Sequence, residues 1–145
     1  MFDFNETLEQ ARQRNIADAL MEDMGICDWT AKLVPHKVVQ AQLIVRQDAV
    51  LCGVDWFEGT LKKLDPNAKV TWHYMEGDQM QADTKVCDIT ADAQALLSAE
   101  RTGINFLQTL SWTASITRQH VDAIADASPN PNGCAVLDTR KTIPG

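Results

Sequence analysis

The 145-residue sequence has no long hydrophobic run and little positive charge. Its apolar stretches are too short to cross a bilayer, so we expect no membrane partner. It carries 13 Lys and Arg against 20 Asp and Glu, a formal net charge of −7, and we therefore expect no nucleic-acid partner, because phosphate binding needs a basic face. The first residues contain no apolar signal segment, which predicts a cytoplasmic location.

Cysteine is also scarce. The four cysteines (Cys27, Cys52, Cys87 and Cys134) form no CxxC pair and do not cluster with a histidine. A zinc site needs closely spaced ligand pairs, and a disulfide scaffold needs a much higher density of cysteine. We therefore expect reduced, mostly buried thiols and no metal site built from these residues.

What is present predicts a folded α+β chain. The hydrophobic content of 45% is ordinary for a globular protein. Thr7 and Gln10 predict a capping box that opens a helix, and Gly25 predicts its end. Alternating or short apolar runs predict strands at 38–45, 70–74 and 86–89. A short helical pattern predicts a helix at 55–64, and turn residues predict a turn at 76–78. Large aromatic residues in these strands are expected to serve sheet packing.

A long helical pattern follows from residue 90 to residue 127. Its apolar residues recur every three or four positions, and Gly103 or the segment 111–113 is expected to interrupt it. The sequence SPNPNG at 128–133 ends the pattern. So small a sheet cannot cover both ends of so long a helix, so we expect a partner chain to cover part of its apolar stripe.

The apolar run 134–137 is typical of a buried parallel strand. Few residues follow it, so no further strands or helices are available to cover it, and its side chains should be exposed. We therefore expect an N-terminal domain at 1–127, the start of a second, truncated domain at 128–145, and a chain that is the first part of a larger protein.

Two groups of cationic residues are candidates for ligand binding. Thr139, Arg140 and Lys141 follow Asp138, the first residue after the predicted strand 134–137. Two cations with hydroxyl neighbours suit a phosphate or carboxylate, although a solvated charged turn would look the same. Arg101 and Asn105 lie one helical turn apart on the same face, although a surface helix with Arg101 paired to Glu100 or solvated gives the same pattern. No histidine lies beside a candidate nucleophile, so no catalytic residue is assigned.

Longer segments resemble a known family. The segments AERTGINFLQTL (99–110) and LDTRKTIPG (137–145) are similar to the GERTALNFLQ and DTRKT-x-PG motifs of quinolinate phosphoribosyltransferases, the carboxylating nicotinate-nucleotide pyrophosphorylases. The segment EDMGICDWT (22–30) is similar to the family's ED-x-G-x-GD-x-T. Residues 46–53 and 76–78 match further landmarks in the same order, so the resemblance covers nearly the whole chain.

The resemblance implies a fold and a reaction. The fold would be an N-terminal α/β sandwich followed by an α/β barrel, of which this chain holds only the first strand. The reaction would move a phosphoribosyl group from phosphoribosyl pyrophosphate to quinolinate with decarboxylation, giving nicotinate mononucleotide, pyrophosphate and CO2, with Mg²⁺ as cofactor. Active sites would form between the subunits of a homodimer or higher oligomer. Arg101 would then reach a quinolinate carboxylate in the partner's site, while Thr139, Arg140 and Lys141 would line the substrate pocket.

The sequence departs from the family pattern at two places. Cys27 stands where the family commonly has glycine, and Trp112 with Thr113 replaces a glycine and a small apolar residue. A tryptophan at a close helix contact would force its neighbours apart. The alternative functions are a non-catalytic short homologue that acts as a binding or dimerisation module, and the molybdenum-transport-associated paralogue. In every case we expect the chain alone to be inactive.

Overall fold

The structure is a computed structural model, and it describes residues 6–125, 127, 129, 133–139 and 141. In this part of the chain the helices are α1 (Leu8–Met24), α2 (Trp29–Lys32), α3 (Val54–Leu64) and α4 (Ala93–Ile124). The strands are β1 (Val38–Ile44), β2 (Ala49–Val50), β3 (Lys69–Trp72), β4 (Gln79–Met80) and β5 (Lys85–Asp92). The predicted α+β class is confirmed, as are the three predicted longer strands.

The main sheet is antiparallel, in the order β1-β5-β3. Its central strand β5 places Ile89 opposite Ala41 of β1 and Val70 of β3, so apolar side chains line up across all three strands. The short strands β2 and β4 form a second, two-stranded ladder, which the sequence pattern did not predict. Two-residue strands are too short to show an alternating pattern.

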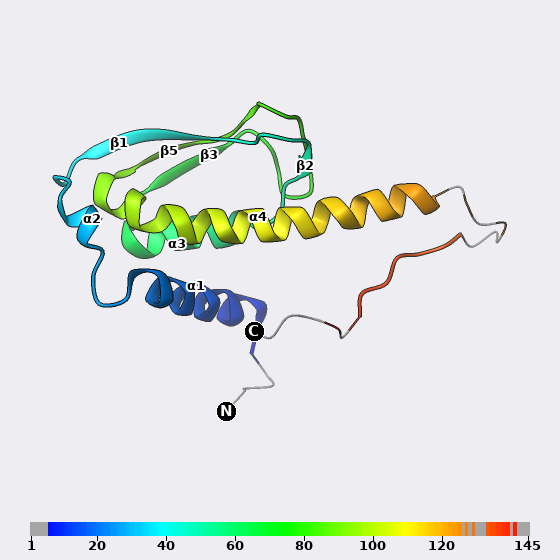
Figure 1. Cartoon of the computed structure of the whole chain (residues 1–145), viewed down its shortest axis with the longest axis horizontal. Coiled ribbons are helices and arrows are strands. Elements are labelled where there is room, and N and C mark those ends of the chain that lie inside the picture. Colours follow the sequence, from blue (N-terminus) through cyan, green and yellow to red (C-terminus); the bar gives the residue numbers. More distant parts are fainter. Residues whose placement is uncertain (1–5, 126, 128, 130–132, 140, 142–145) are drawn as a thin grey trace.

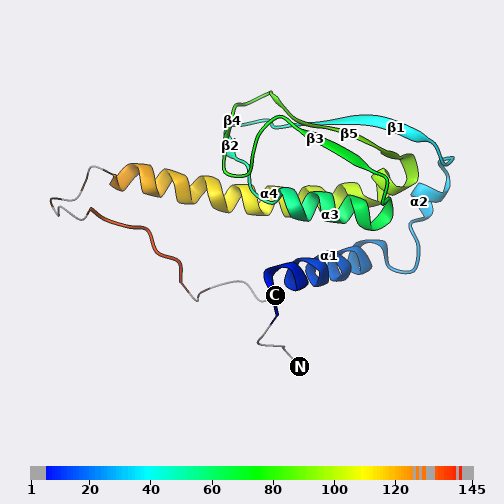
Figure 2. The same ribbon diagram turned by 180° about the vertical axis from the view of Figure 1, so that it is seen from behind.

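The elements form three layers. Figures 1 and 2 show the main sheet on one side of α3 and α4, and α1 on the opposite side of these two helices. The core lies between the sheet and the helices and includes the buried side chains of Leu51, Phe57, Leu61, Cys87 and Leu107. The predicted role of the strand aromatics in packing is confirmed, since Trp72 meets Phe57 edge to face at a centroid distance of 5.6 Å.

The ends of α1 confirm their predicted signals. Thr7 and Gln10 form the capping box, and the helix ends at Gly25, which has a φ of 55°. The segment after it contains an element that the sequence pattern did not predict, because residues 29–32 form the helix α2. The cause is Asp28, whose side chain accepts a hydrogen bond of 2.9 Å from the backbone N–H of Ala31 and so satisfies a free helix end.

Helix α4 is one continuous helix of 32 residues, and the predicted interruption is wrong at both places. At Gly103 the missing side chain serves close packing, because a Cβ there would lie 3.1 Å from Phe57 Cδ2. At Ser111 the hydroxyl accepts a hydrogen bond from the backbone N–H of Cys52 and donates one to its carbonyl, each 3.0 Å long. Trp112 points away from this contact and is 67% exposed, so the predicted clash does not occur.

The predicted strand 134–137 does not form, because the described residues 133–139 contain no strand. A strand persists only where another strand pairs with its backbone groups, and no described residue pairs with this segment. The predicted exposure of its side chains is confirmed, with Leu137 80% exposed.

The later part of α4 also extends past the sheet (Figure 1), and the buried residues of this helix end at Ser111. The domain limits 1–127 and 128–145 stay a prediction.

All four thiols are free, as predicted, but the prediction that most are buried is wrong. Only Cys87 is buried, while Cys27 and Cys52 are intermediate and Cys134 is exposed. Burial raises the pKa of the Cys87 thiol to about 12 and that of Cys52 to about 11, so both are neutral near pH 7. Across the described residues, no helix has the length and apolar content needed to cross a membrane.

Candidate functional site

Arg101 lies on the exposed face of α4, and 76% of its side chain is accessible to solvent. It borders an open hollow of about 750 Å³ between α1 and α4. Asn105 lines the same hollow, so the predicted shared face of these two residues is confirmed. The other residues that line it are Asn15, Ala19, Glu22, Asp23, Trp56, Thr102, Phe106, Thr109 and Leu110.

Arg101 pairs with a residue far away in the sequence. Its Nη1 donates to Oδ1 of Asp23 over 2.9 Å, and this carboxylate belongs to the last turn of α1. The ion pair with Glu100 does not form, because the Arg101 guanidinium pairs with Asp23 instead. Most of the Arg101 side chain is nevertheless in contact with solvent, as the other alternative expects. Sequence reasoning missed Asp23 as a site residue, although it belongs to the EDMGICDWT segment that carries part of the family resemblance.

The surroundings of Arg101 are acidic. Glu22 and Asp23 line the hollow, and Arg101 is the one cation among its described lining residues. Asp28 lies nearby, and its pKa is lowered, first by the hydrogen bond from the backbone N–H of Ala31, then by the Ser98 hydroxyl at 2.7 Å, with a smaller effect of the Arg101 charge. Arg101 is therefore the place at which this hollow can attract an anion.

An exposed guanidinium held on one side suits carboxylate binding. The group has five N–H donors in a planar fork, and the contact with Asp23 uses the Nη1 edge. The remaining donors can form two parallel hydrogen bonds with a second carboxylate. Because Arg101 projects outward, such a carboxylate can approach from a ligand in solution or from a ligand held by another chain.

The second group of predicted residues lies apart from this hollow. Thr139 and Lys141 are exposed, and the Lys141 backbone N–H donates to the Thr139 hydroxyl over 3.2 Å. Neither residue lines the hollow around Arg101. Arg140 lies outside the described residues. The structure therefore leaves the predicted role of Thr139, Arg140 and Lys141 as a prediction.

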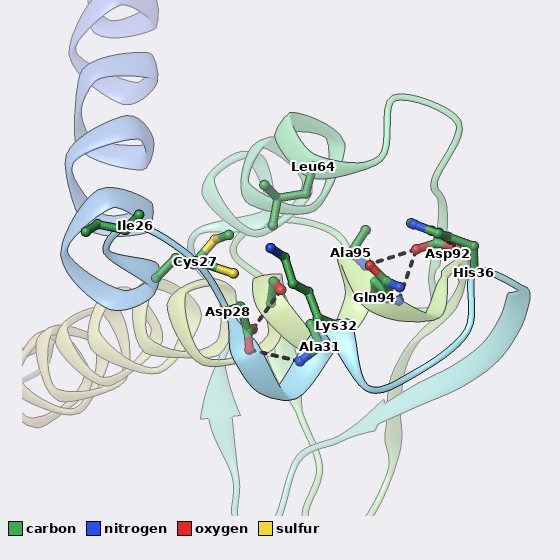
Figure 3. A pocket seen from close by; sticks show the side chains of 12 residues that line it. Ile26, Cys27, Asp28, Ala31, Lys32, His36, Leu64, Asp92, Gln94 and Ala95 are labelled. Carbon is green, nitrogen blue, oxygen red and sulfur yellow. Dashed lines mark hydrogen bonds and ion pairs between the residues drawn. The ribbon is translucent and has the colours of Figure 1, made fainter.

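A smaller hollow of about 340 Å³ lies where the chain after α1 passes the end of α3 and the start of α4 (Figure 3). Its polar groups already have structural partners. Asp28 caps α2, while Asp92 caps α4 and contacts His36 Nδ1 at 3.2 Å. Cys27 lines this hollow, and it is not among the described residues with a positive φ, so a glycine is not required at its position.

The described residues offer no carboxylate set for the Mg²⁺ that the resemblance implies. Within the described ranges, no three His, Cys, Asp or Glu side chains gather closely enough to hold a metal ion. A magnesium ion in a protein is usually bound by one or two carboxylates together with substrate phosphates. The described residues therefore provide no ligand set of their own for this ion.

A small antiparallel sheet backed by helices, with an exposed arginine beside an open hollow, defines an α+β domain with a candidate anion contact. Residues 28–111 match the model of the quinolinate phosphoribosyl transferase N-terminal domain. The match covers more than half of the chain, which therefore belongs to the quinolinate phosphoribosyltransferase family.

Individual relatives agree with this assignment. The chain is 31% identical to quinolinate phosphoribosyltransferase (decarboxylating) 1 of Nicotiana glauca over 88% of this chain and 35% of that protein. It is 33% identical to a probable carboxylating nicotinate-nucleotide pyrophosphorylase of Synechocystis over 87% of this chain and 41% of that protein. The nicotinate-nucleotide pyrophosphorylase structure from Francisella tularensis superposes with a TM-score of 0.79 at 31% identity, covering 86% of this chain and 44% of that one.

The chain spans well under half of the length of these relatives. The matched family model is that of the N-terminal domain, and the predicted N-terminal fold is thereby confirmed. The activity of the relatives as whole proteins is therefore attributed to this chain only as a proposal.

Proposed function

We propose that this chain is the N-terminal part of a phosphoribosyl-transferring enzyme that makes nicotinate mononucleotide, pyrophosphate and CO2 from quinolinate and phosphoribosyl pyrophosphate. The match of residues 28–111 to the N-terminal domain of this family carries the proposal. The enzyme acts in NAD biosynthesis. Its location is the cytoplasm, with which four free thiols are compatible.

Arg101 is the residue of the described chain that contacts substrate in this proposal. Quinolinate is a dianion, and binding it requires fixed positive charge and good hydrogen-bond donors. Arg101 projects 76% of its side chain to solvent, so it can enter the site of a second subunit rather than a pocket of its own chain. The active protein is accordingly a homodimer or higher oligomer.

The remaining substrate contacts come from the segment after α4 and from other parts of the enzyme. Thr139, Arg140 and Lys141 line the pocket for the anionic substrates, with Arg as a fork donor and Lys as a point charge. Mg²⁺ binds together with phosphoribosyl pyrophosphate, through groups outside the described residues.

The direct test is an assay of the protein as its gene encodes it. Purified protein is incubated with quinolinate, phosphoribosyl pyrophosphate and Mg²⁺, and nicotinate mononucleotide and CO2 are measured. We expect both products in equal amounts, and none when quinolinate is replaced by nicotinate. If quinolinate neither binds nor reacts, the chain belongs to a binding or dimerisation module instead.

The same assay is applied to the 145-residue chain expressed by itself. We expect no product from it, because Arg101 is the one cation in its described hollow. We also expect it to associate, since the apolar residues of the later part of α4 and Leu137 are exposed. Sedimentation velocity gives the oligomeric state, and a monomer or clear turnover would contradict these expectations.

Substitution of Arg101 tests its proposed role. We expect Arg101→Ala to cost about 2–5 kcal/mol of quinolinate binding, as truncation of a buried charge pair does, with a much smaller effect on phosphoribosyl pyrophosphate. Arg118→Ala is the matched control, because Arg118 is exposed on the same helix, 17 residues further along. A similar loss in both variants would point to the total charge rather than to a contact of Arg101.

Mixed oligomers test whether Arg101 acts across the subunit interface. Subunits with Arg101→Ala are combined with subunits carrying Arg140→Ala, so that one mixed site contains both intact residues. We expect the mixture to recover part of the activity that each variant lacks. Activity that stays at the level of the separate variants would place Arg101 in the site of its own subunit.

A further inference from the structure

The ion pair between α1 and α4 joins two unequal partners. Only 21% of the Asp23 side chain is exposed, compared with 76% of Arg101. The carboxylate is thus the fixed member of the pair, and the guanidinium is the member that projects into the hollow. A surface ion pair of this kind contributes little to the stability of a protein, so a stabilising role does not explain the pair.

The position of Asp23 is set by the packing of α1. Ile16 and Leu20 of α1 are buried against the other helices, at 1% and 6% exposure. Ile16 occupies the space beside Gly59 of α3, where an added Cβ would lie only 2.6 Å from its Cδ1. This packing fixes the position of α1, and with it the position of the Asp23 carboxylate in the last turn of α1.

We propose that Asp23 is a positioning residue that holds Arg101 in the orientation needed to receive a substrate carboxylate. The Oδ1–Nη1 contact of 2.9 Å holds one nitrogen of the guanidinium, while the side chain stays 76% exposed, so its other donors are accessible to a ligand. A long arginine side chain without such a partner samples many rotamers, and ordering it on binding costs affinity. This proposal rests on the proposed function, because it gives Arg101 a substrate to receive.

Asp23 also has an opposite electrostatic effect. Its negative charge weakens the attraction of Arg101 for a dianion, so its removal could strengthen binding if charge alone mattered. Glu22 separates the two effects, because it lines the same hollow, is exposed, and carries the same charge without being an ion-pair partner of Arg101. Glu22→Gln is therefore the matched control for Asp23→Asn, since each variant removes one negative charge.

The experiment measures quinolinate binding at equilibrium and steady-state kinetics in the protein that its gene encodes. We expect Asp23→Asn to weaken quinolinate binding about tenfold, on the scale at which outer partners of metal-binding side chains act, because a neutral amide oxygen holds the guanidinium less firmly than a carboxylate does. The kcat and the KM for phosphoribosyl pyrophosphate should stay within about twofold, because the lost interaction concerns substrate binding alone. Glu22→Gln should bind quinolinate as well as the wild type or better. In the Arg101→Ala background, Asp23→Asn should have no further effect.

The results distinguish failure of the proposed substrate contact of Arg101 from failure of the proposed positioning role of Asp23. If wild-type protein does not bind quinolinate, or Arg101→Ala binds it normally, the proposed role of Arg101 fails and that of Asp23 fails with it. If Arg101→Ala weakens binding but Asp23→Asn matches Glu22→Gln, only the positioning role is wrong. An equal loss from Asp23→Asn with and without Arg101 would also overturn it. Thermal unfolding midpoints of all variants exclude a general loss of folded protein.

Discussion

At the scale of single residues, glycines show where this fold needs close contacts. Gly53 precedes α3 with a φ of 105°, a backbone conformation that other residues rarely adopt. A Cβ added there would lie 2.9 Å from Cδ1 of Leu110 on α4. Gly53 thus lets the start of α3 approach α4, whereas Gly77, with a φ of 91°, has open space around it.

We expect Gly53→Ala to destabilise the protein by roughly 2–4 kcal/mol, of which about 1–2 come from the backbone conformation and the rest from overpacking. Gly77→Ala is the matched control with a positive φ but no clash, and it should lose only roughly 1–2 kcal/mol. Urea unfolding of both variants measures the difference. Equal losses would show that Leu110 moves aside without cost.

At the scale of elements, the start of α3 is capped from a turn rather than from its own sequence. The N-cap residue Gly53 has no side chain that could do this. Instead, Glu76 accepts hydrogen bonds from the backbone N–H groups of Gly53, at 2.7 Å, and Val54, at 3.1 Å. The turn 76–78 therefore satisfies the free end of a helix that begins 22 residues earlier in the chain.

We expect Glu76→Ala to destabilise the protein by about 1–2 kcal/mol, the range of a lost helix cap. Glu76→Gln keeps an acceptor oxygen but loses the negative charge at the positive end of the helix, so it should lose less. Unfolding free energies from urea titrations rank the three proteins. A Gln variant as unstable as the Ala variant would show that the charge, rather than hydrogen bonding, stabilises α3.

At the scale of the whole molecule, ionised aspartates connect segments that are separate in the sequence. Asp28 links α2 to Ser98 of α4, and Asp88 on the central strand contacts His73 at 2.7 Å. The pKa of Asp88 is lowered, first by the Lys85 amino group and then by His73. For Asp92, burial acts to raise the pKa, but the backbone N–H of Ala95, His36 and the backbone N–H of Gln94 outweigh it, so the pKa is lowered.

These lowered pKa values predict acid sensitivity. An aspartate whose folded-state pKa lies below the unfolded value of about 3.9 stabilises the fold above that pH, and the stabilisation is lost as the pH falls through the folded-state pKa. We therefore expect the unfolding free energy to be level near neutral pH and to fall below about pH 4. Urea titrations across this range measure it. Asp88→Asn should give a shallower fall, and an identical profile would exclude Asp88 as a contributor.

The sequence alone determined the features that depend on near neighbours. The capping box of Thr7, the alternation in β1 and the stop at Gly25 each involve residues a few positions apart, and all three are present in the structure. The motif around Arg101 was also sufficient to indicate the family, because its residue types recur there at fixed spacing. Local signals of this kind can be recognised in the sequence without knowing how the helices and strands pack.

Only the tertiary structure decided which distant groups meet. Asp23 and Arg101 are 78 positions apart, and no local pattern distinguishes this pairing from the rejected contact with Glu100. The same holds for Trp112, whose outward position depends on how α4 lies against the segment containing Cys52. Such contacts arise from the packing of whole helices and strands, which fixes the distance and direction between residues that the sequence leaves independent.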